Sequence, residues 1–129
     1  MNITFFDDPL EGPRAPEDVR VEQIGIYIHE DKRRVAVGLK MTPFRQRPSI
    51  EITLKNAHGE TAATMTVIEA LRPDISFTLH LRDSKPTVEY ETAVTLYYAT
   101  PETERQSVHT ATVYFDLDGP TEQLFDVAK

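Results

Sequence analysis

The stretch "TVEYETAVTLYY", residues 87–98, alternates apolar with polar side chains and indicates how the chain folds. Val88, Tyr90, Val94, Leu96 and Tyr98 would share one face. A period of two residues is typical of a β-strand with one buried and one solvated face. Strands of this kind are characteristic of antiparallel sheets. The stretch therefore predicts a long strand in an antiparallel sheet.

Six further segments show the same alternation and are separated by turn residues. They cover residues 19–30, 34–41, 49–55, 61–71, 75–82 and 107–117. The first changes parity near Glu22 and Gln23, which predicts a β-bulge, and Gly59 is expected at positive φ in a turn. No segment has a sustained helical period, so no helix can cover an apolar sheet face. We therefore expect an all-β fold, a two-sheet antiparallel sandwich of about seven strands.

Charge is concentrated at the two ends of the chain. The 129 residues carry a formal net charge of -7. Residues 1–18 and 116–129 account for all of it, because the body between them holds equal numbers of acidic and basic residues. We divide the chain into an acidic, proline-rich N-terminal segment (1–18), a β-sandwich domain (19–117) and an acidic C-terminal tail (118–129). A neutral body with acidic ends argues against nucleic-acid binding, which needs positive surface.

The sequence contains no cysteine, which excludes disulfides and thiolate metal sites. Its first residues lack the charged and apolar regions of a signal peptide, and no run approaches the ~18 apolar residues of a membrane span. These features predict a cytoplasmic protein without membrane contact.

The strand number and spacing over residues 19–117 resemble the immunoglobulin-like superfold, of which fibronectin type III domains are one branch. Tyr90, which follows "RDSKPTVE", occupies the position where such folds place a tyrosine that bonds back across a corner. The sequence lacks the cysteine pair and the tryptophan of antibody domains. The resemblance implies architecture and no activity.

Residue patterns that support catalysis are missing from the sequence. There is no G-x-S-x-G, P-loop or G-x-G-x-x-G motif. The four histidines, His29, His58, His80 and His109, show no ligand spacing typical of a metal site. We expect no enzymatic activity, no cofactor and no metal.

The proline-stiffened loops "TPFRQRPS", "EALRPD" and "ATPETERQS" should meet at one end of such a sandwich. They would bring together one aromatic and four basic residues: Phe44, Arg45, Arg47, Arg72 and Arg105. Arginine binds carboxylate or phosphate through two hydrogen bonds, so this end is a candidate site for a small anion or an acidic peptide. The alternative is a set of ordinary polar loops whose arginines pair with nearby acids.

A second candidate surface is the outer face of the sheet that holds the third, sixth and seventh predicted strands. It would expose threonines and tyrosines: Thr53, Thr95, Tyr97, Thr110, Thr112 and Tyr114. Such side chains suit a flat protein contact, although they also suit any β-surface. We predict a non-catalytic interaction module that uses this face for a protein partner or for self-association, with the arginine-rich end as the alternative site.

Overall fold

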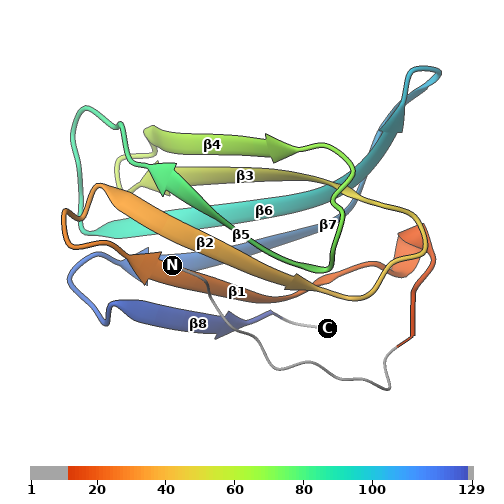
Figure 1. The fold of residues 1–129 in the computed structure, drawn as a ribbon. Helices are drawn as coiled ribbons and strands as arrows, with labels where there is room; N and C mark the ends of the chain where they lie inside the picture. The colour runs from red at the N-terminus through yellow and green to blue at the C-terminus, as the bar shows by residue number, and fades with distance from the viewer. Residues whose placement is uncertain (1–11, 128–129) are drawn as a thin grey trace.

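The computed structural model describes residues 12–127, so residues 1–11 of the predicted N-terminal segment lie outside the described residues. Eight strands follow a short 3₁₀ helix (Figure 1). In chain order the elements are η1 (Pro16–Asp18), β1 (Val21–Ile28), β2 (Arg34–Met41), β3 (Ser49–Asn56), β4 (Thr61–Val67), β5 (Asp74–His80), β6 (Glu89–Thr100), β7 (Thr103–Asp116) and β8 (Glu122–Asp126).

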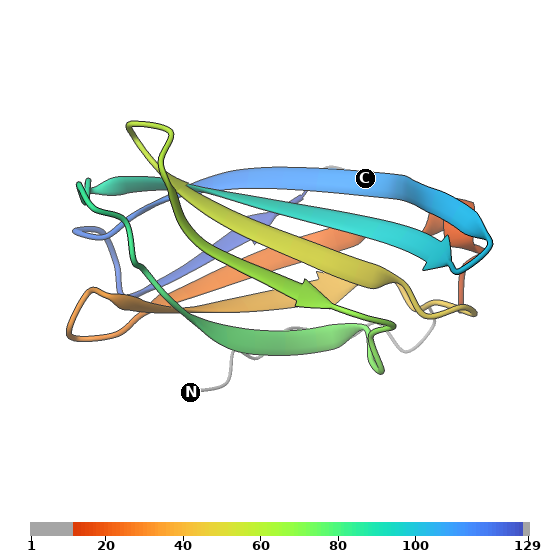
Figure 2. The same cartoon turned by 90° about the horizontal axis from the view of Figure 1, so that it is seen from above.

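The strands form two antiparallel sheets packed face to face (Figure 2). One sheet has the order β5-β2-β1-β8 and the other β4-β3-β6-β7. The predicted two-sheet antiparallel sandwich is confirmed. In antibody constant domains the fourth strand joins the sheet of the first, second and fifth, whereas here β4 pairs with β3. The arrangement is compatible with an immunoglobulin-like sandwich.

The interior is built from the alternating apolar positions of the central strands. Ile24 and Ile26 of β1 lie opposite Leu39 and Val37 of β2, and all four are fully buried. Burying a side chain of this size stabilises the fold by about 1.5–3 kcal/mol. The predicted bulge is confirmed by a register shift between Val21 and Gln23. The bulge places Val21, Ile24 and Ile26 on the same buried side.

The segment that we predicted as an acidic tail contributes an eighth strand. β8 pairs with β1, with Phe125 opposite Ile24, and thereby extends the first sheet. Phe125 packs against the core, while Leu124 points outward. A strand of only five residues is too short to show a clear period of two. It is held in place by pairing with β1, which lies far away in the chain.

The prediction of a loop between residues 98 and 107 is wrong. β6 continues to Thr100 and β7 begins at Thr103, so the two strands form a hairpin that projects from the body (Figure 1). Pro101 sits in the tight turn, where its fixed φ is favourable. The Thr103 N–H donates to Thr100 Oγ1 at 3.1 Å. A two-stranded ribbon in solvent needs no apolar face, so its sequence shows no alternation.

A buried polar network closes the end of the sandwich where β3 turns into β4. Tyr90 is fully buried and donates to Asp83 Oδ2 at 2.8 Å, which confirms the predicted bond across the corner. The same oxygen accepts from Asn56 Nδ2 at 2.9 Å, and Arg33 reaches Oδ1 at 3.3 Å. The network joins three connections of the chain. The β3–β4 turn beside it has Gly59 at φ 83°, as expected.

Candidate functional site

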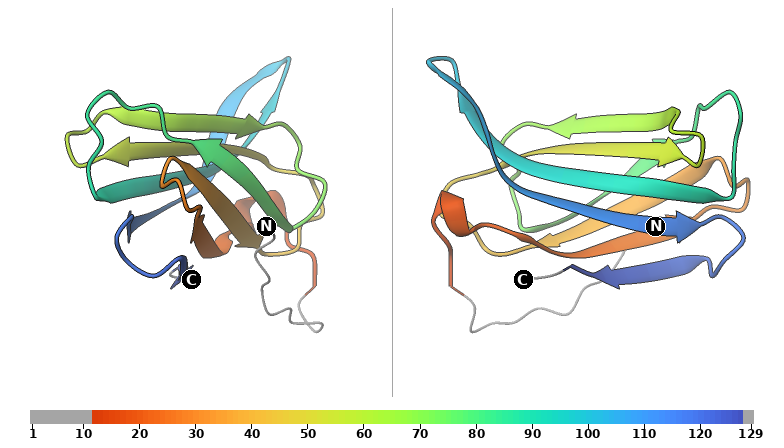
Figure 3. Two further views of the ribbon diagram at one scale, coloured as in Figure 1. Left: turned by 60° about the vertical axis from the view of Figure 1, so that its left-hand side comes forward. Right: turned by 180° about the vertical axis from the view of Figure 1, so that it is seen from behind.

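Three connections meet at the opposite end of the sandwich and are joined by main-chain hydrogen bonds. We call this the loop end, and it comprises residues 12–14, 42–48 and 68–73 (Figure 3). The Arg14 N–H donates to the Pro43 carbonyl at 2.8 Å, and the Arg45 N–H returns to the Arg14 carbonyl at 3.1 Å. The Ala70 N–H donates to the Pro48 carbonyl at 2.8 Å. These bonds fix the loops relative to one another.

Two aliphatic side chains are exposed on this end. Ile68 is 66% exposed and Leu71 is 75% exposed, whereas Ala70 between them is buried and anchors the loop. Glu69 has φ 52°, a left-handed conformation that is unfavourable for a residue with a side chain. Its N–H donates to Ser49 Oγ at 3.1 Å. The loop is therefore held in a strained shape that turns two apolar groups outward.

Three of the predicted arginines lie at the loop end. Arg45 and Arg47 of the β2–β3 connection and Arg72 of the β4–β5 connection are exposed. None of them forms an ion pair with another residue of the described range 12–127. Phe44 is half-buried against the core, and its main chain forms a parallel β-bridge with Arg14. It therefore anchors the β2–β3 connection to the core. Ile68 and Leu71 were not predicted as site residues, although Leu71 falls within the predicted loop "EALRPD", because the predicted strand 61–71 also covered both of them.

Arg105 does not join this cluster, because it lies within β7. Its guanidinium bonds both carboxylate oxygens of Glu51, at 3.1 and 3.3 Å. It also covers the Tyr97 ring, with 4.0 Å from Cζ to the ring centroid. The Arg105 side chain bonds hold the pKa of the Glu51 carboxyl below its ordinary value. Arg105 therefore belongs to the outer face of the second sheet.

That outer face carries exposed Thr110, Thr112 and Tyr114. The hydroxyl groups of Thr95 and Thr110 lie 3.2 Å apart on neighbouring strands. Tyr97 is only 7% exposed because Arg105 lies over it. Tyr114 is 55% exposed, and its hydroxyl donates to Glu91 Oε2 at 3.1 Å, which raises the pKa of the tyrosine. The remaining predicted members, Thr53 and Thr112, face Ala93 from the two sides.

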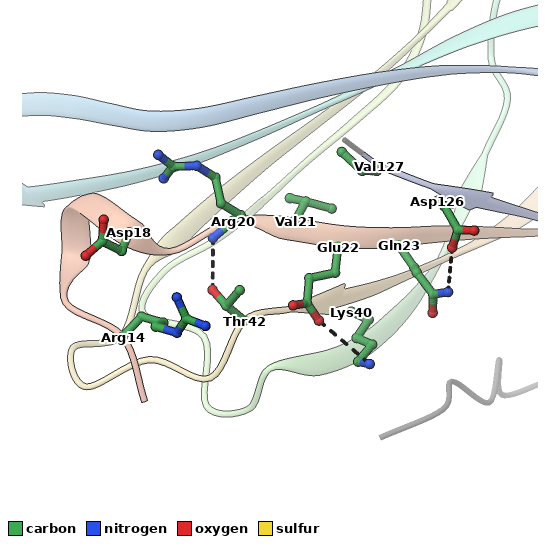
Figure 4. Close-up of a pocket in the computed structure, with 10 residues that line it drawn as sticks. All are labelled: Arg14, Asp18, Arg20, Val21, Glu22, Gln23, Lys40, Thr42, Asp126 and Val127. Atoms are coloured by element: carbon green, nitrogen blue, oxygen red, sulfur yellow. Dashed lines mark hydrogen bonds and ion pairs between the residues drawn. The ribbon is translucent and has the colours of Figure 1, made fainter. Parts of the chain in front are cut away.

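A shallow groove of about 470 Å³ lies over β1, β2 and the end of β8 (Figure 4). Acidic and basic side chains alternate around it. Lys40 lies 3.7 Å from Glu22, and Gln23 donates to Asp126 at 2.7 Å. The lining holds three basic residues (Arg14, Arg20 and Lys40) and three acidic residues (Asp18, Glu22 and Asp126), so neither charge is in excess. No motif in the sequence pointed to it.

The histidines are dispersed, with His80 in β5 of one sheet and His109 in β7 of the other. His109 Nδ1 accepts the Val21 N–H at 2.9 Å and so links β7 to the bulge of β1. Burial, and secondarily the charge of Arg20, lower the pKa of His109. In residues 12–127 no three His, Asp or Glu side chains are grouped to hold a metal ion.

No known protein family matches the sequence, and no curated protein matches it either. Solved structures with a similar fold include the β-glucuronidase of Bifidobacterium dentium complexed with coumarin-3-O-glucuronide, with a TM-score of 0.55 and 15% identity. The β-glucuronidase of Parabacteroides merdae is another, with a TM-score of 0.52 and 14% identity. In both cases 77% of this chain is covered, against 18% and 14% of those chains. The likeness shows a shared β-sandwich fold.

Between Gly12 and Val127, no helix is long and apolar enough to cross a membrane.

Proposed function

We propose that this chain is a non-catalytic interaction module that binds a protein partner through its loop end. The observation that carries the proposal is the position of Ile68 and Leu71, exposed on a pinned loop beside Arg45, Arg47 and Arg72. Aliphatic and arginine side chains together fit a partner segment that combines apolar residues with carboxylates. The absence of cysteine in the sequence is compatible with a cytoplasmic site of action.

The energetics favour binding at this end. Covering one aliphatic side chain contributes about 1.5–3 kcal/mol, which is roughly tenfold or more in affinity. Arginines that form no ion pair within residues 12–127 can offer their donors to a carboxylate, and charge-assisted bonds are the stronger kind. Because main-chain hydrogen bonds already fix the loops, little conformational entropy would be lost on binding.

The perturbed ionisable groups support a role without catalysis, because each serves a structural contact. Glu60 has its pKa lowered to about 2 because it accepts the Ser84 N–H and hydroxyl. Asp31 has its pKa lowered to about 2 by the Arg33 N–H and the Arg34 side chain. Similar sandwiches form a small share of the β-glucuronidase chains, which is compatible with a module that works beside other domains.

A peptide titration tests the proposal. The probe is a short acetylated peptide that alternates aspartate with leucine, added to the labelled full chain while amide resonances are followed. We expect resonances of residues 45–47 and 68–72 to move. The double variant Ile68→Ser/Leu71→Ser should weaken binding by about tenfold or more. Replacing Arg45, Arg47 and Arg72 by alanine should also weaken binding and remove most of its salt dependence.

Lys85→Ala is the matched control, since it removes an exposed cation at the other end of the sandwich. It should bind the peptide as the parent chain does. Titration with inorganic phosphate distinguishes the small-anion alternative, which predicts shifts at the arginines without the aliphatic residues. If both probes leave the loop end unchanged, or if the peptide binds elsewhere, the proposal is wrong.

The outer Thr/Tyr face is a second candidate surface for a protein contact. Its support is Tyr114, an exposed aromatic ring whose hydroxyl is already fixed by Glu91. An immobilised aromatic side chain loses little entropy on binding. Thr95→Lys places a charge at the centre of this face, so a contact made there should weaken when that variant is used.

A further inference from the structure

The four edge strands of the sandwich differ in how their edges are protected. β5 carries Asp74 and His80, β8 carries Glu122 and Asp126, and β7 carries Glu104, Arg105, His109 and Asp116. β4 reads T-A-A-T-M-T-V and has no ionisable residue, proline or glycine. Natural sheets usually block pairing at an edge with charges, prolines or bulges. β4 is thus the one edge strand in the described residues without such a charge.

The main chain of β4 has groups available for pairing. The Asn56 N–H donates to the Glu60 carbonyl, so the even-numbered residues of β3 direct their main-chain groups toward β4. Ile52 is paired with Met65 and Ile50 with Val67, whereas Thr64 and Thr66 lie at the alternating positions. Their N–H and C=O groups therefore point away from β3. Within residues 12–127 no main-chain hydrogen bond outside the strand pairings involves Thr64 or Thr66.

The boundary of this available edge is set by Ala62, whose carbonyl accepts the Arg82 N–H at 2.9 Å. Beyond it, β4 forms the border of its sheet, at the top of Figure 1. A groove of about 400 Å³ runs between β4 and β5, and Ala63, Met65 and Leu79 contribute to its lining. Ala63 and Met65 are partly buried and face the core. An added strand could place side chains there.

We propose that a second copy of this chain adds its own β4 to this edge, antiparallel, with Thr64 of each copy opposite Thr66 of the other. This register pairs all the outward main-chain groups of both threonines. The two Met65 side chains then meet on the groove side, and threonines line the outer side. The contact joins the β4-β3-β6-β7 sheet of one copy to the same sheet of the other copy, and the dimer has two-fold symmetry.

A second copy fits this edge because antiparallel β4 strands present the same uncharged residues to each other. No like charges meet, and small and flexible side chains alternate along the pair. The contact is limited to one strand from each copy, well below the ~1,200 Å² of a stable interface. The dimer should therefore be weak and depend on protein concentration.

Sedimentation velocity of the full chain tests this, over about 10 µM to about 1 mM, a range suited to a weak complex. We expect a monomer–dimer equilibrium and, by NMR, concentration-dependent shifts at the Thr64 and Thr66 amides. Thr64→Lys/Thr66→Lys sets lysines opposite one another and should raise the dimer Kd at least tenfold. Thr66→Pro removes one outward donor at an edge position that tolerates proline, and should act in the same direction.

Thr95→Lys is the matched control, because it adds one lysine to the same sheet on the central strand β6. It should leave the β4 dimer intact. A chain that remains monomeric up to about 1 mM overturns the proposal, since even weak interfaces associate in that range. A dimer that persists in Thr64→Lys/Thr66→Lys but is lost in Thr95→Lys also overturns it, and assigns association to the outer Thr/Tyr face.

Discussion

The two ends of this sandwich use similar residue types in opposite ways. At the corner end, formed by residues 29–33, 56–60 and 81–90, polar side chains bond to one another and to the main chain. The buried carboxylate of Asp83 accepts from Asn56, Tyr90 and Arg33. At the loop end, Arg45, Arg47 and Arg72 have no ion-pair partner in the described range, and two aliphatic residues face solvent. The polar groups of the corner end bond to one another, whereas the arginine and aliphatic side chains of the loop end remain available to a partner.

This difference separates stability from function. A buried polar group costs free energy unless it is bonded, so the corner end must be complete in the isolated chain. Exposed arginines and aliphatic residues contribute little to folding, and they are available for a contact with another molecule. We therefore expect substitutions at the corner end to change stability, and substitutions at the loop end to change binding.

The largest effect is expected for Asp83→Ala. It removes the acceptor of the buried Tyr90 hydroxyl, and such a group costs about 1–3 kcal/mol. It also removes one bond of Asn56, whose Nδ2 keeps the Lys85 carbonyl at 3.0 Å and Glu60 Oε1 at 3.3 Å. We expect the free energy of unfolding to fall by about 3 kcal/mol. Urea denaturation measures it. The matched loop-end variant Arg72→Ala should change stability by less than about 0.5 kcal/mol. Equal losses in the two variants would remove the distinction between the ends.

A smaller effect of opposite sign is expected for Glu69→Gly. Glu69 holds φ 52°, and glycine adopts this conformation without steric cost. We expect the free energy of unfolding to rise by about 0.5–1 kcal/mol. The corner end offers a comparison in Lys32, at φ 55°, whose ammonium pairs with Asp118 at 2.9 Å. Lys32→Gly should gain less, because it loses that pair. Destabilisation by Glu69→Gly would show that the loop is unstrained.

The smallest effect concerns pH, and the Val21–His109 bond and the corner end should respond in different ranges. The folded-state pKa of His109 is lowered, so the unfolded chain binds a proton more readily below pH ~6.5. Stability near the Val21–His109 bond should therefore fall as pH drops below ~6.5, until the lower folded-state pKa is passed. Glu60 has a pKa of about 2, against an ordinary 4.5. Its contribution at the corner end should persist until pH falls below that ordinary value.

Hydrogen exchange of single amides, corrected for intrinsic rates, separates these ranges. The Val21 amide should lose protection between pH 7 and pH 5.5 (from about half a unit above to about one unit below the ordinary histidine pKa), whereas the Ser84 amide should keep it. His109→Gln retains an acceptor without a titrating ring and should abolish the change at Val21. Parallel behaviour of the two amides in the parent chain would contradict this prediction.

Much of the fold was predictable from local sequence. The alternation of Ile24, Ile26 and their counterparts in other strands predicted the sandwich, and the position of Tyr90 predicted the bond across the corner. The β6–β7 hairpin was not predictable, because a solvated ribbon shows no apolar alternation. β8 was missed because a short acidic strand is stabilised mainly by pairing with β1.

The candidate site was predictable only in part. The prolines and arginines around residues 42–48 and 72 pointed to the loop end, and Arg45, Arg47 and Arg72 lie there. Arg105 was assigned to the wrong surface because the segment predicted as a loop around it is part of β7. Ile68 gave a usable signal, because an apolar residue directly after Val67 breaks the period of two, whereas Leu71 continues that period. The uncharged edge strand β4 could not be recognised before the strand order was known.

The sequence by itself determined the seven alternating segments and their division into buried and solvated faces, because side chains alternate on a pleated strand whatever its neighbours are. The tertiary structure alone decided that β8 joins the first sheet, which strands became edges and which arginines formed an ion pair within residues 12–127. Those outcomes depend on contacts between residues far apart in the chain, and no local pattern encodes them.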